Sequence, residues 1–288
     1  MEGKLYPGHG RRSASYTRPH TVTVLDDILA RKRDEVTLLR RPQTRDLLRK
    51  HALDAPPARD FGAALRRANG RIAVIGEIKR RSPSKGDLAP DLDPATSAQA
   101  YAAGGAAALS VLTDAPFFGG RVDDLTAARA ATSLPVLRKD FTIDEVQVYE
   151  SRAIGADAIL LIAAAIPDDA LLSDLHALAV ERGLAVLVEA HDATEIDRAV
   201  RAGAVIIGVN NRNLATFEED LGIGESLVAR IPASAVAVAE SAVRTPADAA
   251  RFGAVGFDAV LVGEALVRAD DPTALARDLG AAPVNRRS

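Results

Sequence analysis

Several short apolar runs in this chain end in charged side chains whose types suit catalysis. Glu77 and Lys79 close the first of these runs, Lys139 closes another, and Glu189 and Glu240 close two more. A charge at the end of a buried strand is costly unless it is paired or hydrated, so its recurrence favours a functional site over a solvated rim of salt bridges. A carboxylate base and a lysine acid suit proton transfer, and a lysine also suits Schiff-base formation with a carbonyl.

Other kinds of site lack the residues that they need. Cysteine is absent, which excludes disulfides, thiolate metal ligands and a cysteine nucleophile. The five histidines, His191 among them, do not recur at metal-ligand spacing, so we interpret all of them as surface residues and predict no metal site. The first apolar run ends in Glu-Ile-Lys and carries no G-x-G-x-x-G fingerprint of a dinucleotide-binding fold.

Eight apolar, β-branched runs position these side chains. They end roughly 20 to 35 residues apart, and the Ala-rich stretch after each run leaves room for one helix and two loops. Because the runs are continuously apolar, we expect strands buried on both faces, and hence a parallel sheet. Eight such units over residues 71–280 predict an α/β fold of the (β/α)₈ TIM-barrel class. The runs are 72–79, 107–114, 135–140, 158–163, 185–190, 205–210, 235–241 and 259–264.

The segments on either side of the predicted barrel have a different character. Residues 1–21 contain glycine and proline without a helical period, and we predict a flexible arm. Residues 22–70 are predicted to form an N-terminal helical extension, which opens with an amphipathic helix from Val22 to about Arg41 that Pro42 ends. Residues 281–288 are predicted to form a tail.

Composition and charge narrow the class of protein further. The chain has 288 residues, of which 48% are hydrophobic and 26% charged, and this is typical of a globular protein with a large core. Residues 1–70 carry 15 Lys and Arg against 8 Asp and Glu, but aromatic residues make up only 4% of the chain, which disfavours a base-stacking surface for nucleic acid. No apolar run approaches the roughly 18 residues of a membrane helix. No apolar segment follows the Arg11-Arg12 pair to complete an export signal, so we expect a cytoplasmic protein that binds neither nucleic acid nor membrane.

Two loops at the predicted strand ends suit a phosphate. In barrels of this class, the loops after strands seven and eight and the N-terminus of a short helix commonly form a phosphate site. Here those loops contain Ser241 and Ala242 in one, and Gly263 and Glu264 in the other. Backbone N–H groups hold an anion there without a basic side chain, although a tight turn alone also explains Gly263. We therefore expect a small, phosphorylated substrate.

The segment IGEIKRRSPSKG at positions 75–86 resembles the signature of the indole-3-glycerol phosphate synthases, the ring-closing enzymes of tryptophan biosynthesis. Its E-x-K-x-x-S-P-S pattern is specific among (β/α)₈ enzymes, and the resemblance covers about residues 22–278. The similarity continues at nearly every predicted strand end, in SVLTD (110–114), FGG (118–120), LRKDF (137–141), LVEAH (187–191), IGVNNRNL (207–214), AES (239–241) and VGEAL (262–266).

The resemblance implies an activity as well as a fold. The expected substrate is 1-(2-carboxyphenylamino)-1-deoxyribulose 5-phosphate, and the expected products are indole-3-glycerol phosphate, CO₂ and water. The family's N-terminal helices cap the barrel and contribute to substrate binding, which fits residues 22–70. No cofactor or metal is implied, and we take a monomer as the expected state.

The resemblance also implies roles for individual residues. Lys139 matches the general acid that protonates the substrate's ketone oxygen, and Glu189 matches the proposed general base. Lys79 and Glu77 match residues for binding and for the later dehydration, and the division of work between them stays open. The other implied positions are Asn210, which orients Glu189; Ser82 and Arg212, near the anthranilate carboxylate; Phe141, at the anthranilate ring; and Ser241, Gly263 and Glu264, in the phosphate loops.

Ala242 departs from the family pattern, which usually has glycine at this position after Glu-Ser. We expect this loop to lie at negative φ, because a non-glycine residue at positive φ is uncommon. At positive φ, Ala242 would instead carry strain of about 1–3 kcal/mol, and replacement by glycine would then favour phosphate binding.

Two other functions stay open from the residues alone. One is a Schiff-base aldolase that acts on a phosphorylated sugar through Lys139, and borohydride trapping would reveal it. The other is a barrel without activity that only binds a phosphorylated ligand. Loss of a catalytic position would favour the inactive barrel, but Lys79, Lys139, Glu189 and Asn210 are all present.

Overall fold

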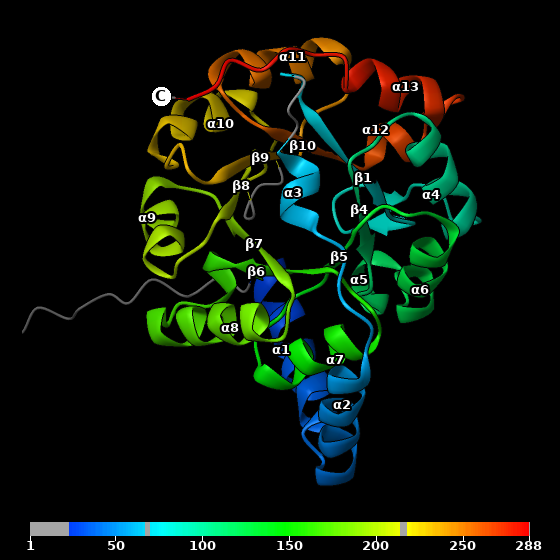
Figure 1. Cartoon of the computed structure of the whole chain (residues 1–288), viewed down its shortest axis with the longest axis vertical. Helices are drawn as coiled ribbons and strands as arrows, with labels where there is room; N and C mark the ends of the chain where they lie inside the picture. The colour runs from blue at the N-terminus through cyan, green and yellow to red at the C-terminus, as the bar shows by residue number, and fades with distance from the viewer. Residues whose placement is uncertain (1–22, 67–69, 214–217, 288) are drawn as a thin grey trace, which may run out of the picture.

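The computed structural model describes residues 23–66, 70–213 and 218–287, so the predicted arm at residues 1–21 lies outside the described part of the chain. Eight parallel strands close into a barrel in chain order, with helices around the outside (Figure 1). This confirms the predicted (β/α)₈ fold. The barrel strands are β1 (Ala73–Ile78), β4 (Ala108–Leu112), β5 (Val136–Lys139), β6 (Ala158–Ile162), β7 (Ala185–Ala190), β8 (Ile206–Asn210), β9 (Val236–Glu240) and β10 (Ala259–Val262).

Alternate residues of each strand face the inside of the barrel, as the strand period of two requires. In β1, Ala73 and Ile75 belong to the interior cluster of buried side chains, while Val74 and Ile78 belong to the cluster between the strands and the outer helices. This alternation continues to the C-terminal ends of the strands, where the next inward positions are polar. The apolar layers therefore form a packed floor beneath a polar mouth.

The outer helices begin at capping residues that fix where each chain segment turns back. The side chains of Asp144, Asp168 and Thr245 accept hydrogen bonds from backbone N–H groups in the first turns of their helices, and this satisfies donors that a helix start leaves free. The helices are α4 (Pro94–Ala103), α5 (Ala115–Phe118), α6 (Val122–Ala131), α7 (Glu145–Ala153), α8 (Asp169–Glu181), α9 (Ala193–Arg201), α10 (Leu221–Leu227), α11 (Pro246–Val255), α12 (Glu264–Val267) and α13 (Pro272–Leu279), with 3₁₀ turns η1 (Ala163–Ala165) and η2 (Val228–Arg230) and a small hairpin of β2 (Arg81–Ser82) and β3 (Gly86–Asp87).

Within the described residues, three further helices precede the barrel: α1 (Val24–Leu39), α2 (Pro42–Asp54) and α3 (Phe61–Leu65). The predicted first helix is present, but Pro42 is the first residue of α2 rather than the end of α1, since proline is readily accommodated in a first helical turn. α2 projects from the barrel beside α7 (Figure 1). Phe61 and Leu65 of α3 are fully buried among the first interior residues of the strands, so α3 closes the N-terminal end of the barrel.

A buried ion cluster holds α1 against the C-terminal end of the barrel, opposite the end that α3 closes. The ammonium of Lys32, whose side chain is 3% exposed, lies 2.8 Å from Oδ1 of Asp140 and 3.1 Å from Oδ2 of Asp114. These aspartates follow β5 and β4, and Glu35 on α1 gives Lys32 a third carboxylate at 2.8 Å. Burial would raise the pKa of Asp140, but Arg138 and Lys32 lower it to about 2. The cluster therefore places α1 across the mouth of the barrel.

Replacing Lys32 with methionine is expected to lower the free energy of unfolding by about 3–5 kcal/mol, because it removes the ammonium that pairs with the buried carboxylates of Asp114 and Asp140. Urea denaturation measures the loss. Lys50→Met is the control, since that ammonium is 74% exposed beside Asp54 and its removal should cost at most about 1 kcal/mol. Equal losses in the two variants would contradict the assignment.

The same variant has an expected pH dependence. A carboxylate with a lowered pKa adds stability above its unfolded value, and that stability is lost as the pH falls through the folded value. For Asp140 this window runs from about pH 4 down to about pH 2. The difference in stability between the wild type and Lys32→Met should thus be full above pH 4 and shrink as the pH approaches 2, which acid titration of the unfolding transition measures.

The C-terminal residues of the described chain pack against the barrel. Ala282 accepts a hydrogen bond from the backbone N–H of Ile72, and Arg287 lies 3.0 Å from Asp258, so residues 281–287 pack against the barrel.

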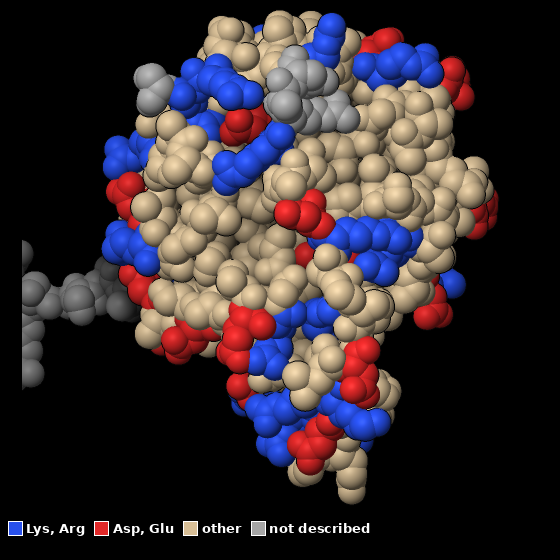
Figure 2. Space-filling model, viewed as in Figure 1, with Lys and Arg blue, Asp and Glu red and all other residues tan. Residues whose placement is uncertain are grey.

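On the face shown in Figure 2, acidic and basic side chains are interspersed over the projecting helices. Among the described helices, none is long and apolar enough to cross a membrane. The predicted domain boundaries stay predictions.

Candidate functional site

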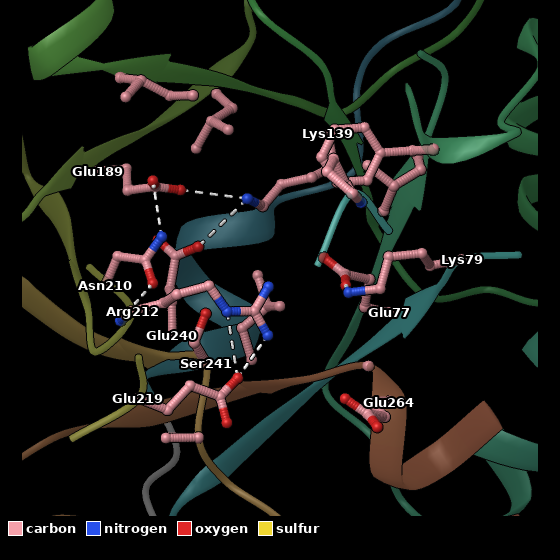
Figure 3. A pocket seen from close by; sticks show the side chains of 18 of the residues that line it. Glu77, Lys79, Lys139, Glu189, Asn210, Arg212, Glu219, Glu240, Ser241 and Glu264 are labelled. Carbon is pink, nitrogen blue, oxygen red and sulfur yellow. Dashed lines mark hydrogen bonds and ion pairs between the residues drawn. The ribbon is translucent and has the colours of Figure 1, made fainter. Parts of the chain in front are cut away.

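A pocket opens at the C-terminal ends of the strands, where α1 and the loops after the strands enclose it (Figure 3). Its wall contains eleven of the twelve predicted site residues, so the fold brings together positions that span most of the chain. Ser82 is the exception, because its neighbour Pro83 lines the pocket in its place. The predicted residues in the wall are Glu77, Lys79, Lys139, Phe141, Glu189, Asn210, Arg212, Ser241, Ala242, Gly263 and Glu264.

The centre of the pocket is an ammonium held between two carboxylates (Figure 3). Nζ of Lys139 lies 3.1 Å from Oε2 of Glu189 and 3.5 Å from Oε2 of Glu240. Burial by itself would lower the pKa of the Lys139 amine, but the surrounding carboxylates, Glu189 foremost, raise it above its ordinary value. Lys139 therefore stays protonated at neutral pH, as a general acid must be before it acts.

The two glutamates beside Lys139 differ in their affinity for a proton. Burial would raise the pKa of Glu189, but the charge of Lys139 and a hydrogen bond from Nδ2 of Asn210, 2.9 Å long, help to hold it below its ordinary value. Burial and the charge of Glu189 instead raise the pKa of Glu240. Environments that separate the pKa values of two neighbouring carboxylates in this way give them different roles. Glu189 is the ionised partner of the two.

A second ion pair lies across the pocket, on the chain that leaves β1. Nζ of Lys79 is 2.6 Å from Oε1 of Glu77. Burial would raise the pKa of Glu77, but Lys79 and Lys139 lower it, so Glu77 is ionised. A Cβ atom on residue 263 would lie 2.5 Å from that same Oε1, so Gly263 leaves the space that the pair occupies.

Asn210 connects the base to an arginine at the pocket wall. Its Oδ1 accepts a hydrogen bond of 3.1 Å from the backbone N–H of Arg212, while its Nδ2 donates to Glu189. The guanidinium of Arg212 forms an ion pair with Glu219 (Figure 3), and Glu219 also pairs with Arg244. A substrate carboxylate that binds Arg212 must therefore compete with Glu219.

Two aromatic rings form an apolar wall near these charges. The centroids of Phe118 and Phe141 are 6.1 Å apart with the planes tilted by 35°, and both side chains line the pocket. Such a pair offers a surface for a planar aromatic group. Ser82, the chain neighbour of the lining residue Pro83, is buried at 3% exposure, and its Oγ has no hydrogen-bond partner among the described residues.

The loop after β9 corrects one prediction. Ser241 and Ala242 have φ angles of 64° and 63°, so the expectation of negative φ at Ala242 is wrong. Both residues lie in the left-handed region, where a side chain carries strain.

Across the pocket mouth, the carboxylate of Glu264 lies 3.6 Å from Nε of Arg268, which offsets part of its negative charge.

Comparison with known proteins decides the family. The family model described as indole-3-glycerol phosphate synthase matches residues 25–279. The chain belongs to the indole-3-glycerol phosphate synthase family. The resemblance of its strand-end motifs to this family is thereby confirmed, whereas the roles of single residues in the pocket stay predictions.

Relatives support the same assignment over almost their full lengths. The chain is 51% identical to the indole-3-glycerol phosphate synthase of Laribacter hongkongensis over 87% of this chain and 96% of that protein. The synthase of Albidiferax ferrireducens is 52% identical, over 86% and 95%. A 3-hexulose-6-phosphate synthase structure aligns with a TM-score of 0.58 at 20% identity over 74% of this chain and 100% of that one, which supports the barrel fold alone.

The prediction that all histidines lie at the surface needs correction at two positions, whereas His51 is exposed as predicted and His9 and His20 lie outside the described residues. His191 is not a surface residue, because its side chain is 16% exposed and lies between Glu189 and Glu195. His176 is likewise buried, on the inner face of α8. Sequence spacing misses both, since burial depends on which face of α8 meets the barrel for His176, and on how the loop after β7 packs against α9 for His191. Among the described residues, no group of three or more His, Asp or Glu side chains is arranged to hold a metal ion.

Three residues in the pocket of this synthase-family chain contact predicted site residues but have no role in the motif-based predictions. Glu240 has only the status of a charged strand end in the sequence. The signal that could have placed it is Gly208 on the neighbouring strand β8, where a Cβ atom would lie 2.0 Å from Oε1 of Glu240. Glu219 belongs to none of the motifs, and only the fold brings it to Arg212. Phe118 stood in a motif without a role and packs against Phe141.

Ala242→Gly is expected to lower KM for the phosphorylated substrate with little change in kcat, because glycine adopts φ near 63° without strain. Inorganic phosphate should also bind more tightly, and the melting temperature should rise. The control is Ala254→Gly inside α11, where the same change should cost about 1 kcal/mol. An unchanged KM together with an unchanged phosphate affinity would show that the strain has no bearing on binding.

Proposed function

We propose that this chain is an indole-3-glycerol phosphate synthase that converts 1-(2-carboxyphenylamino)-1-deoxyribulose 5-phosphate to indole-3-glycerol phosphate, CO₂ and water. The observation that carries this proposal is the partly buried ammonium of Lys139, held between Glu189 and Glu240 at the barrel mouth. The names of relatives at about half identity over nearly their whole length support the same activity.

Ring closure needs a strong electrophile, because the attacking aromatic carbon gives up its aromaticity. Lys139 donates its proton to the ketone oxygen as the new carbon–carbon bond forms, and its positive charge stabilises the developing alkoxide. The ketone oxygen thus becomes a hydroxyl group. Phe118 and Phe141 would hold the anthranilate ring, and Arg212 would hold its carboxylate in place of Glu219.

Decarboxylation and dehydration complete the reaction. The carboxylate leaves as CO₂, and its electron pair restores the aromatic ring. The new hydroxyl then leaves as water while the adjacent methylene carbon loses a proton, which requires one acid and one base. Glu189, ionised and oriented by Asn210, is suited to accept protons, and the Glu77–Lys79 pair across the pocket supplies a second acid–base couple.

The phosphate of the substrate would bind at the loops after β9 and β10. Ser241, Ala242, Gly263 and Glu264 all line the pocket there, and Gly263 lies beside the Glu77–Lys79 pair. Backbone N–H groups in such loops hold phosphate in other barrels. At Glu264 we assign binding to the backbone, since a carboxylate side chain repels phosphate.

The alternative of a Schiff-base aldolase conflicts with the charge on Lys139. A lysine nucleophile needs a lowered pKa, whereas the carboxylates around Lys139 raise it. We therefore expect no borohydride trapping of a carbonyl substrate on this residue. A barrel that only binds phosphorylated ligands is disfavoured because the acid, the base and the orienting amide all face one pocket.

The test is a fluorescence assay of indole-3-glycerol phosphate formation from the synthetic substrate by the full chain. Steady formation of the product supports the proposal. Binding of the substrate without turnover would instead favour the inactive barrel, and borohydride trapping would favour the aldolase. A monomeric state, a cytoplasmic location and the absence of nucleic-acid binding stay predictions.

A further inference from the structure

The imidazole of His191 lies next to Glu189, the proposed base. It follows β7, and its Nε2 lies 3.4 Å from Oε1 of Glu189. On the other side of the ring, Nδ1 is 3.0 Å from Oε2 of Glu195, near the start of α9. The imidazole therefore bridges a carboxylate inside the pocket and one outside it.

The local backbone fixes this histidine. Oε2 of Glu195 also accepts a hydrogen bond of 2.8 Å from the backbone N–H of His191, so one carboxylate oxygen holds both the main chain and the ring. With Nδ1 engaged in this way, Nε2 is left to face Glu189 and has no hydrogen-bond partner within the described residues. Both ring nitrogens thus face carboxylates, an arrangement that the doubly protonated imidazolium satisfies.

We propose that His191, anchored by Glu195, is a positioning residue that keeps the carboxylate of Glu189 ionised and aimed at Lys139. The proposal rests on the proposed function, in which Glu189 is the base. His191 does not line the pocket and acts on substrate only through Glu189. Its contribution comes from its positive charge. A neutral ring could not form an ion pair with both carboxylates, and it would not lower the pKa of Glu189.

The charges around the pair favour this state. Burial would lower the pKa of His191, but Glu189 from β7 and Glu195 from α9 raise it to about 10. Glu189 in turn faces Lys139 from β5 and Glu240 from β9. With two cations beside Glu189 and one beside Glu240, Glu240 binds a proton more readily than Glu189 does.

The first experiment measures the charge of His191 directly. NMR titration of the histidine ring protons, with His191→Gln to assign the signal, should show His191 protonated well above pH 7. Glu195→Gln should shift its midpoint downward. His176 is the internal control, because burial lowers its pKa and it should titrate below the ordinary value. A His191 midpoint near 6.5 would overturn the proposal, whatever the activity of the chain.

The second experiment tests the effect on the base. In His191→Gln, the acid limb of the kcat profile should move upward by about one to three pH units, as expected for loss of an opposite charge at this distance. KM should stay close to the wild-type value, His191→Lys should restore part of the shift, and His176→Gln should leave the profile in place. An unmoved acid limb in His191→Gln would overturn the proposal. If the wild-type chain forms no indole-3-glycerol phosphate, the proposed function fails, while the NMR titration still reports on the ion pair.

Discussion

Lys139→Ala is expected to lower kcat by about 10²–10⁴-fold, the range that a positioned general acid contributes. The ammonium contacts both Glu189 and Glu240, and its raised pKa keeps it protonated until a substrate oxygen takes the proton. KM should change much less, because the proposed contacts to phosphate and carboxylate lie on other loops. Steady-state kinetics with the synthetic substrate measure both constants.

Two further variants separate acid catalysis from charge alone. Lys139→Arg keeps a positive charge but holds its proton too firmly to donate it, so kcat should stay low. Lys85→Ala is the matched control, since Lys85 is an exposed lysine on the turn between β2 and β3 and should leave kcat unchanged. A Lys139→Ala enzyme with nearly wild-type kcat would disprove the role of general acid.

Glu189→Gln is expected to lower kcat to a similar degree, by about 10²–10⁴-fold, because glutamine keeps the shape of the side chain but cannot accept a proton as a base. The melting temperature should stay level or rise. The charge of Glu189 is one reason why the pKa of Glu240 is raised, so its removal lets Glu240 ionise and pair with Lys139 in its place.

Thermal unfolding and kinetics on the same preparation distinguish catalysis from structure. Glu225→Gln, which removes an ion pair with Arg251 on the outer helices, is the control and should leave kcat unchanged. If Glu189→Gln unfolds instead, Glu189 is a structural member of an ion cluster. A folded variant with full activity would move the role of base to another carboxylate.

The barrel could be predicted from the sequence because its signals are local. Each strand is a short, continuously apolar run that is buried on both faces whatever its neighbours are, and all eight predicted runs contain a strand. The strand ends follow from the same pattern. Since parallel strands place their C-terminal ends at one mouth, residues as distant as Glu77 and Gly263 were predicted to meet there, and they do.

The N-terminal helices were predicted only in outline. Hydrophobic periodicity indicated α1, but nothing in that pattern indicated that Lys32 would be buried against Asp114 and Asp140. On its own helix, a lysine followed by a glutamate three residues later is ordinary for an exposed face. Its burial depends on where α1 docks, and that is set by loops more than 80 residues away in the chain.

The sequence by itself determined the fold class, the family motifs and the set of charged strand ends, because each depends on residue type and short-range spacing. The tertiary structure decided how those charges act on one another. Lys139 lies between two glutamates of unequal proton affinity, His191 faces Glu189 instead of solvent, and Ala242 is held at positive φ. Distances of 3 to 4 Å between side chains on different strands and helices set these properties, since electrostatic interaction and backbone strain depend on packing that no single segment encodes.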